Sequence, residues 1–568
     1  MLTRDGPSDH CTVRRPVMSI QQSDDRRDPL IDEGTEASDA PEVLAEPEPE
    51  KASAFSVKAE LWTMFQMGWP MVISFACRMA MASTDTAFVG HLDNSTIGTF
   101  LDRPFSAKSY LAAGTLTDMV VNVLIVPPLA FNQVLNALVG QALGSGNKQM
   151  AGVWLILSIV FLSVSYVPFM VIQYFYTAKI LGLLGFSEEI QILATLQSRW
   201  NLFWPIPNGI YQCLRFYFQA QGISRPAMWN NLAFVVINGL LNWLFVFGGP
   251  FQYLEEGKGG WHGFGFVGAA MSISTSRCLQ PLTYWLYMFV WKRAHVATWP
   301  GLTLAIFTRD RVVRFLKQAL PYIGTLIFQS ISGQVTTLMI SHLGPLAIAA
   351  SSAVGAVAQV ASSGVSQAFI AVSAVRVGFH LGKGDSRNAQ RAMWLVVVGS
   401  TIFNTILVFA FWPLNEALCS LVTSDVQVLK VAAALVAAQF VQAGLSQLVS
   451  IGTSGVLGGQ GRTFIITLLS FGFELPTSIG GVAIMVYVLK WRMPDGMLKI
   501  TWANAAVALL ELVIVAGIVL CSDWKRYARE ARARQEAAAA ADAEPTVEPI
   551  VAAAEPQEGE AAGGEQEE

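Results

Sequence analysis

Apolar runs recur along this chain, and each is long enough to cross a lipid bilayer. A helix needs about 20 apolar residues to cross the ~30 Å hydrocarbon core. Only 14% of the 568 residues are charged, whereas a soluble protein carries about 25%. We therefore predict an all-α integral membrane protein with twelve transmembrane helices, near residues 61–91, 110–140, 151–175, 192–219, 228–249, 263–291, 319–342, 346–377, 393–414, 428–455, 463–489 and 501–521.

Basic residues are unevenly divided between alternate loops. If the N-terminus is cytoplasmic, most of the loop lysines and arginines fall inside, among them Lys148, Arg225, Arg309 and Lys383. The positive-inside rule then predicts that both termini are cytoplasmic. The two ends are polar, and we expect them to be disordered tails. Their composition favours a plasma or vacuole-like membrane.

The chain repeats itself. "VGQALGSGNKQMA" at 139–151 corresponds to "VGFHLGKGDSRNA" at 377–389, and Trp69-Pro70 corresponds to Leu320-Pro321. Six spans per copy is an even number, so the two copies enter the membrane from the same side and form parallel repeats. We expect a disordered cytoplasmic tail at residues 1–58 and an N-lobe at 59–291. A cytoplasmic inter-lobe linker is expected at 292–318, a C-lobe at 319–522 and an acidic disordered cytoplasmic tail at 523–568.

Several of these stretches resemble those of one transporter family. Pro70 is followed by "DTAFVGHL" at 85–92, and "LRFYFQAQGISRP" stands at 214–226. "GFVGAAMSIS" follows at 265–274 and "AVRVGFHLGKGD" at 374–385. In order and spacing, the chain resembles the multidrug and toxic compound extrusion (MATE) transporters over roughly residues 60–525. The resemblance implies a NorM-like, V-shaped fold of two lobes that exchanges H⁺ or Na⁺ for drugs, metabolites or organic ions.

The resemblance also implies a cation-coupling site in the N-lobe. Asp85 matches the aspartate of the family's first span, and a helix-end carboxylate near the interface is the alternative. Asn238 and Asn242 are one turn apart and share a helix face. Many relatives carry an aspartate at the second of these positions, so the asparagine removes a charge and weakens the case for Na⁺. Asp118 is a further candidate, although a structural role is favoured for it.

The C-lobe departs from the family pattern. Relatives of the NorM and animal types carry a glutamate eight residues after the proline of span seven, and here that position is Gln329. An amide does not titrate, so Glu474 and Glu511 near mid-span are the candidates for a C-lobe coupling role. Carboxylates that are hydrogen-bonded between helices are the alternative for both.

Arginines within the spans raise a different possibility. Arg78 lies two turns before Asp85 and occupies the repeat position of Gln329. It either balances the helix charge or, with Arg277, forms a cationic wall that favours anions. Tyr211 is an aromatic candidate for the substrate pocket, with helix packing as its alternative.

These observations favour a secondary active antiporter that exports organic compounds, with organic cations first, in exchange for H⁺ rather than Na⁺. The alternatives are an organic-acid exporter of the same fold and a lipid-linked saccharide flippase. The sequence carries no P-loop, HExxH motif or nucleophile elbow, so we expect neither an enzyme nor a cofactor. The expected partners are a small organic substrate, the coupling cation and the bilayer. We expect no nucleic acid partner, no metal site and a monomer.

Overall fold

The fold is described from a computed structural model, which describes residues 55–92, 107–253, 261–341, 343, 345–420, 426–489 and 495–543. Residues 1–54 and 544–568 of the two predicted tails lie outside these residues. Within the described residues, helices are the only regular secondary structure.

The first repeat begins with a long helix and ends with a helix that finishes in a π-helical turn. Its helices are α1 (Val57–Gly90), α2 (Ala107–Gln133), α3 (Leu135–Gly144), α4 (Met150–Leu183), α5 (Glu188–Trp200), α6 (Pro205–Ala220), α7 (Arg225–Phe247) and α8 (Phe266–Trp285), with the short elements η1 (Gly249–Tyr253) and η2 (Leu286–Trp291).

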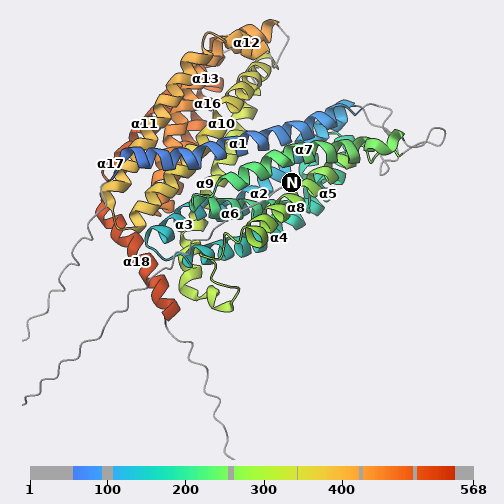
Figure 1. Cartoon of the computed structure of the whole chain (residues 1–568). Helices are drawn as coiled ribbons and strands as arrows, with labels where there is room; N and C mark the ends of the chain where they lie inside the picture. The colour runs from blue at the N-terminus through green and yellow to red at the C-terminus, as the bar shows by residue number, and fades with distance from the viewer. Residues whose placement is uncertain are drawn as a thin grey trace, which may run out of the picture. The chain divides into compact units, whose positions relative to one another are not determined.

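The second repeat follows the turn η3 (Leu304–Phe307). Figure 1 shows α11, α12, α13, α16 and α17 grouped together, apart from the group that holds α2 to α8. The helices are α9 (Arg309–Ser341), α10 (Pro345–Gly382), α11 (Ser386–Phe411), α12 (Asn415–Ser420), α13 (Val426–Ser450), α14 (Gly458–Gln460), α15 (Thr463–Leu469), α16 (Leu475–Ala483), α17 (Asp495–Leu520) and α18 (Trp524–Ala543), with η4 (Ile451–Leu457), η5 (Ser470–Glu474) and η6 (Ile484–Val488).

Local chemistry explains several helix ends. Ser56 caps α1 by accepting a hydrogen bond from the Ala59 amide, and Asp385 caps α11 by accepting one from the Asn388 amide at 3.0 Å. Both are side chains that satisfy amides of a first turn. Pro205 begins α6, where its missing N–H leaves no bond unmade. Span four is therefore two helices, α5 and α6, rather than the single helix that the apolar run 192–219 predicts.

Eight helical stretches of the described chain are long and apolar enough to cross a membrane. They correspond to α2–α3, α4, α7, the second half of α10, α11, α13–α14, α15–η6 and α17. The other four predicted spans are α1, α5–α6, α8 and α9, and these meet that standard less well because they are shorter or more polar. Three of them carry arginines that matter below.

Some helix faces that the packing leaves open are apolar. Ile402, Ile406 and Phe409 of α11 are exposed by 56%, 59% and 72%. An exposed apolar stripe on a helix of this length is expected where the helix contacts lipid.

The repeated glycine motif explains how the two repeats meet. α3 of the first repeat packs on α10 of the second. A β-carbon at Gly140 would lie 2.9 Å from the carbonyl oxygen of Val375, and one at Gly144 would collide with the carbonyl of Phe379. A β-carbon at Gly382 would collide in turn with the carbonyl of Gln141. The two copies of the motif thus pack backbone against backbone, at the helix ends that the charge pattern assigns to the cytoplasm.

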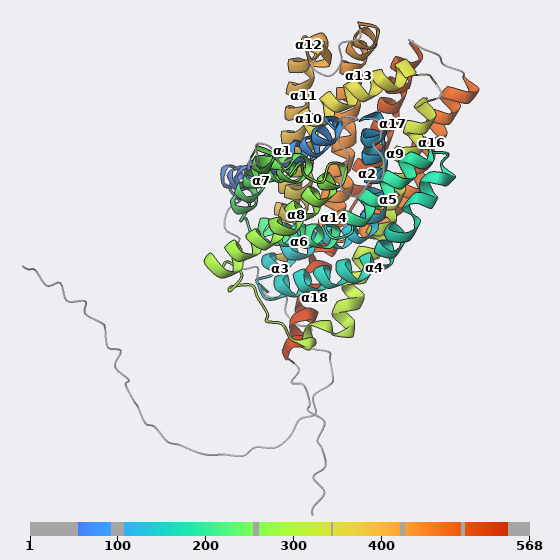
Figure 2. The ribbon, with the colours of Figure 1, turned by 90° about the vertical axis from the view of Figure 1, so that its right-hand side faces the viewer.

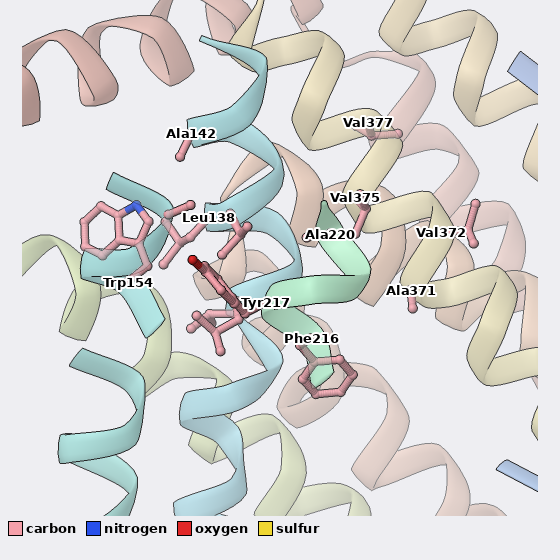
Figure 3. Close-up of a cluster of buried hydrophobic side chains, with 14 of the residues drawn as sticks. Leu138, Ala142, Trp154, Phe216, Tyr217, Ala220, Ala371, Val372, Val375 and Val377 are labelled. Carbon is pink, nitrogen blue, oxygen red and sulfur yellow. The ribbon is translucent and has the colours of Figure 1, made fainter. Parts of the chain in front are cut away.

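An apolar core surrounds this junction. Figure 3 shows Leu138 and Ala142 of α3, Trp154 of α4 and Phe216 of α6, with Val375 of α10 among the side chains of the same cluster. Each of these five side chains is less than 9% exposed. This core therefore joins the two repeats, and smaller apolar clusters lie within each repeat.

The structure corrects the predicted boundaries at three points. Residues 524–543, which the acidic composition places in a disordered tail, form α18. Its Trp524, Ala528 and Ala531 are buried, and it contacts α3, α10 and α11, as Figure 2 also indicates for α3. The apolar residues lie three or four apart, so one face is apolar and packs. The expected linker ends early, because α9 begins at Arg309, and α1 begins at Val57, within the expected N-terminal tail.

Candidate functional site

A buried polar group links α1 and α7 in the first repeat. Asp85 is only 8% exposed, and its Oδ1 accepts a hydrogen bond of 2.8 Å from Nδ2 of Asn242. Asn238, one turn earlier on α7, lies 3.3 Å from the same Nδ2 through its Oδ1. Both asparagines are fully buried. The structure thus brings together the three residues that the sequence assigns to one site.

Asp118 of α2 belongs to the same neighbourhood. Its carboxylate is within electrostatic range of Asp85 and is partly exposed. Two neighbouring carboxylates disfavour one another's charge. The arrangement can take up and release protons, which is the chemistry that a proton-coupling site requires.

A second polar group lies in the second repeat. Gln329 of α9 donates a hydrogen bond of 3.4 Å from its Nε2 to Oε2 of Glu474, and Glu511 of α17 is within electrostatic range of Glu474. Both glutamates are partly exposed. The replacement of the family's span-seven glutamate by Gln329 therefore leaves an amide that contacts a carboxylate on another helix.

The backbone at Glu474 is unusual. Glu474 ends η5, a π-helical turn between α15 and α16, and Pro476 follows within the first two positions of α16. Proline has no N–H, so the regular bond to the preceding turn is lost and the helix widens. Such turns are frequent at functional positions.

Arg78 and Arg277 of the first repeat lie within electrostatic range of one another and of Tyr211. The guanidinium carbon of Arg78 lies 5.6 Å from the centre of the Phe75 ring. Arg277 of α8 is within electrostatic range of Arg78 and of Asp85. Tyr211 of α6 is fully buried and is within electrostatic range of both arginines. These three residues, predicted as cleft residues, therefore share one neighbourhood. Gln329, the fourth, lies with the group in the second repeat.

Two functional candidates escape the sequence analysis. Arg215 stands within "LRFYFQAQGISRP" and inside the predicted span 192–219. The rule that singles out Arg78 and Arg277, a charge at membrane depth, also applies to it. Its side chain is 1% exposed and lies against Phe75 and Phe216, at 5.0 and 4.8 Å from the ring centres.

The other is an ion pair between the repeats. Arg376 of α10 donates from Nε at 2.7 Å and from Nη2 at 2.5 Å to the two carboxylate oxygens of Glu60 on α1. Nε2 of His380 lies 3.3 Å from the same carboxylate. The Glu60 and Arg376 side chains are 7% and 13% exposed. No local signal pairs residues 316 positions apart, so only the packing of α1 on α10 reveals this pair.

The fold and the site together define a membrane transporter. Two repeats of membrane-length helices each hold titratable groups within their spans, and the repeats pack against each other. The MatE family model matches residues 70–244 and 321–479, more than half of the chain. The chain belongs to this family, and it is a multidrug and toxic compound extrusion (MATE) family transporter.

Curated relatives from this family are similar to the chain over most of its length. The chain is 26% identical over 517 residues to an uncharacterized transporter of Schizosaccharomyces pombe, covering 85% of each chain. It is 23% identical to the multidrug and toxin extrusion protein 1 of Danio rerio, covering 84% of this chain and 75% of the relative.

Solved structures support the twelve-helix fold. The crystal structure of the eukaryotic MATE transporter AtDTX14 matches with a TM-score of 0.69 at 20% identity, covering 84% of this chain and 99% of that one. The bent form of the Vibrio cholerae transporter VcmN matches with a TM-score of 0.66 at 16% identity, covering 84% and 99%. The predicted fold class is confirmed.

Proposed function

We propose that this protein is a secondary antiporter that exports small organic compounds in exchange for H⁺ by alternating access. The observation that carries the proposal is Asp85, a carboxylate enclosed by Asn242 and Asn238 on a helix that also contacts the second repeat. A carboxylate shielded from water can bind a proton from one side of the membrane and release it to the other when the site changes access.

Proton coupling is favoured over sodium coupling. In this arrangement an amide N–H of Asn242 faces the Asp85 carboxylate, where Na⁺ would need an oxygen ligand. Glu474 and Glu511 supply a second pair of interacting carboxylates in the other repeat. We infer that both repeats take part in proton transfer, the first through Asp85 and Asp118 and the second through Glu474 and Glu511.

Alternating access needs contacts that can break as a unit. The contacts between α3 and α10 and the Glu60–Arg376 pair lie at the predicted cytoplasmic ends. In the proposed cycle these contacts are made when the site faces outward and are lost when it faces the cytoplasm.

Two observations bear on the charge of the exported compound, and they point in opposite directions. The relatives include multidrug and toxin extrusion proteins, and we place organic cations first among the expected substrates. The arginines around Phe75 favour organic anions instead. A lipid-linked saccharide flippase remains the third candidate, while the cytoplasmic termini, the plasma or vacuole-like membrane and the monomer remain expectations.

The test uses the full chain in proteoliposomes with a pH gradient or a Na⁺ gradient. Ethidium serves as the organic cation, and p-aminohippurate and citrate serve as organic anions. We expect the pH gradient to drive transport of at least one probe and Asp85→Asn to abolish that transport. Asn94→Gln, in the first predicted outer loop, is the control and should transport normally. Transport that survives Asp85→Asn under a pH gradient contradicts the proposal, as does transport driven by Na⁺ alone.

A further inference from the structure

Two guanidinium groups share one aromatic ring in the first repeat. Arg78 and Arg215 lie 5.6 and 5.0 Å from the centre of the Phe75 ring, and Arg78 is within electrostatic range of both Arg215 and Arg277. We call Arg78, Arg215 and Arg277 the arginine cluster. The hydroxyl of Tyr211 is within electrostatic range of all three of its members.

The cluster lacks matching negative charge. In the described chain no carboxylate lies within 4 Å of any of the three guanidinium groups. Beyond Glu60, which pairs with Arg376, and two glutamates at the start of α5, the carboxylates of α1 to α8 are Asp85 and Asp118. Three buried or half-buried cations therefore face two carboxylates that also repel one another.

Arg215 shows the deficit most directly. Its side chain is 1% exposed, and its Nε and Nη1 have no hydrogen-bond partner within the described residues. Attraction to the faces of Phe75 and Phe216 offsets part of its desolvation but supplies no acceptor for the N–H groups. A buried guanidinium normally meets a carboxylate or a carbonyl oxygen, so an acceptor is missing.

The cluster lies where the two repeats meet. A β-carbon at Gly364 of α10 would lie 3.4 Å from Cβ of Phe75, so Phe75 packs against the second repeat. Arg78 and Arg277 are partly exposed, whereas Arg215 is buried. A ligand can therefore approach Arg78 and Arg277, and the charge of Arg215 lies within electrostatic range of Arg78.

The second repeat carries no cation at the position that corresponds to Arg78. Gln329 takes the repeat position of Arg78, and the polar groups at that depth are Glu474 and Glu511. The arginine cluster and the group of Glu474 and Glu511 thus carry charges of opposite sign.

We propose that the arginine cluster is the substrate subsite of this transporter and that it binds small organic anions bearing one or more carboxylates. The inference rests on the proposed export function and names the substrate class for it. The planar, multiply donating guanidinium groups suit carboxylates, because two N–H groups of one arginine can bind both oxygens. Phe75, which is partly exposed, offers an apolar surface to the rest of the ligand.

The experiment measures binding without any gradient. Isothermal titration calorimetry of the full chain in detergent, with p-aminohippurate, citrate and ethidium as separate ligands, compares wild type with Arg78→Gln and Arg215→Gln. Arg78→Gln installs the residue that the other repeat carries at this position, so it should fold even if Arg215→Gln does not. Arg225→Gln is the matched control, because Arg225 lies on α7 against Trp69 and outside the cluster. Phosphatidic acid in the same micelles tests whether a lipid-borne anion binds instead.

We expect both organic anions to bind wild type, with Kd about tenfold or more weaker in Arg78→Gln, equivalent to about 1.4 kcal/mol. Arg225→Gln should leave Kd unchanged, and ethidium should bind Arg78→Gln more tightly than wild type, because a repelling charge is gone. The inference is overturned if ethidium binds and neither anion does, if anion Kd is the same in wild type and Arg78→Gln, or if phosphatidic acid alone binds.

The two proposals fail in distinguishable ways. Anions that bind through the cluster but are not moved by a pH gradient uphold the subsite and contradict proton-coupled export. Ethidium that is moved by a pH gradient through Asp85, with no anion binding, upholds proton-coupled export and contradicts the subsite.

Discussion

The Glu60–Arg376 pair joins the two repeats, and we expect its loss to shift the balance between transport states. Glu60→Gln removes one charge and leaves Arg376 buried at 13% exposure without its bidentate partner. Breaking a buried ion pair from one side typically costs about 3–5 kcal/mol. Both side chains keep some contact with solvent, so we take the lower figure of about 3 kcal/mol, which corresponds to about a hundredfold change in an equilibrium.

The assay follows the distance between the repeats. Spin labels at Lys148→Cys and Arg387→Cys, both exposed and just after α3 and at the start of α11, report the separation of the predicted cytoplasmic ends in a background without other cysteines. Wild type should give one short distance. Glu60→Gln should add a longer population, because the contact is made only when α1 lies against α10.

A surface pair supplies the control. Arg526 and Glu530 form an i, i+4 ion pair with side chains 65% and 42% exposed, and pairs of this kind contribute about 0.3–0.5 kcal/mol. Glu530→Gln should therefore leave the distance distribution unchanged. The reasoning is refuted if Glu60→Gln gives the same distribution as Glu530→Gln, because the buried pair would then not hold the repeats together.

Two further predictions concern packing. Gly144→Ala should lower stability by about 1–3 kcal/mol, since its β-carbon would meet the Phe379 carbonyl. Gly480→Ala in α16 has open space around it and should change stability by less than about 1 kcal/mol. Equal thermal unfolding of the two variants in detergent would contradict the backbone contact between α3 and α10. Trp524→Ala should loosen α18, because the indole is 4% exposed and losing a buried tryptophan costs about 3–5 kcal/mol. Trypsin should then cleave within α18 faster than in Glu530→Gln, which keeps every lysine and arginine of α18, and an unchanged rate would show that α18 does not depend on this contact.

Much of the fold could be predicted, because the bilayer imposes a local rule. Each span needs its own run of apolar residues, so the twelve spans can be predicted without knowing how the helices pack. The duplicated glycine motif can likewise be recognised from the sequence alone. Asn238 and Asn242 can likewise be predicted to lie together, since their spacing places them on one face of α7. Asp85 is recognised from its motif, although its hydrogen bond to Asn242 joins positions 157 residues apart.

Other features resisted prediction for identifiable reasons. The tail after residue 523 is rich in alanine and charge, a composition that suits a solvated helix as well as a disordered segment, and only contact with α3, α10 and α11 makes α18 a packed element. The π-helical turn at Glu474 follows from Pro476 together with the packing of its neighbours, so the sequence predicts a proline but not the turn.

The order of residues alone indicates that the chain crosses a membrane in two parallel repeats and that its spans contain charges. Hydrocarbon penalises every exposed backbone group and every unpaired charge, so apolar runs and the charges within them are informative without a structure. Only the packing of the helices shows which charged side chains contact each other. In the folded chain Glu60 pairs with Arg376, Gln329 bonds to Glu474, and Arg215 contacts the same phenylalanine ring as Arg78. Electrostatic and hydrogen-bond energies depend on distances of a few ångströms between side chains on different helices, and the order of residues along the chain does not specify those distances until the helices have packed.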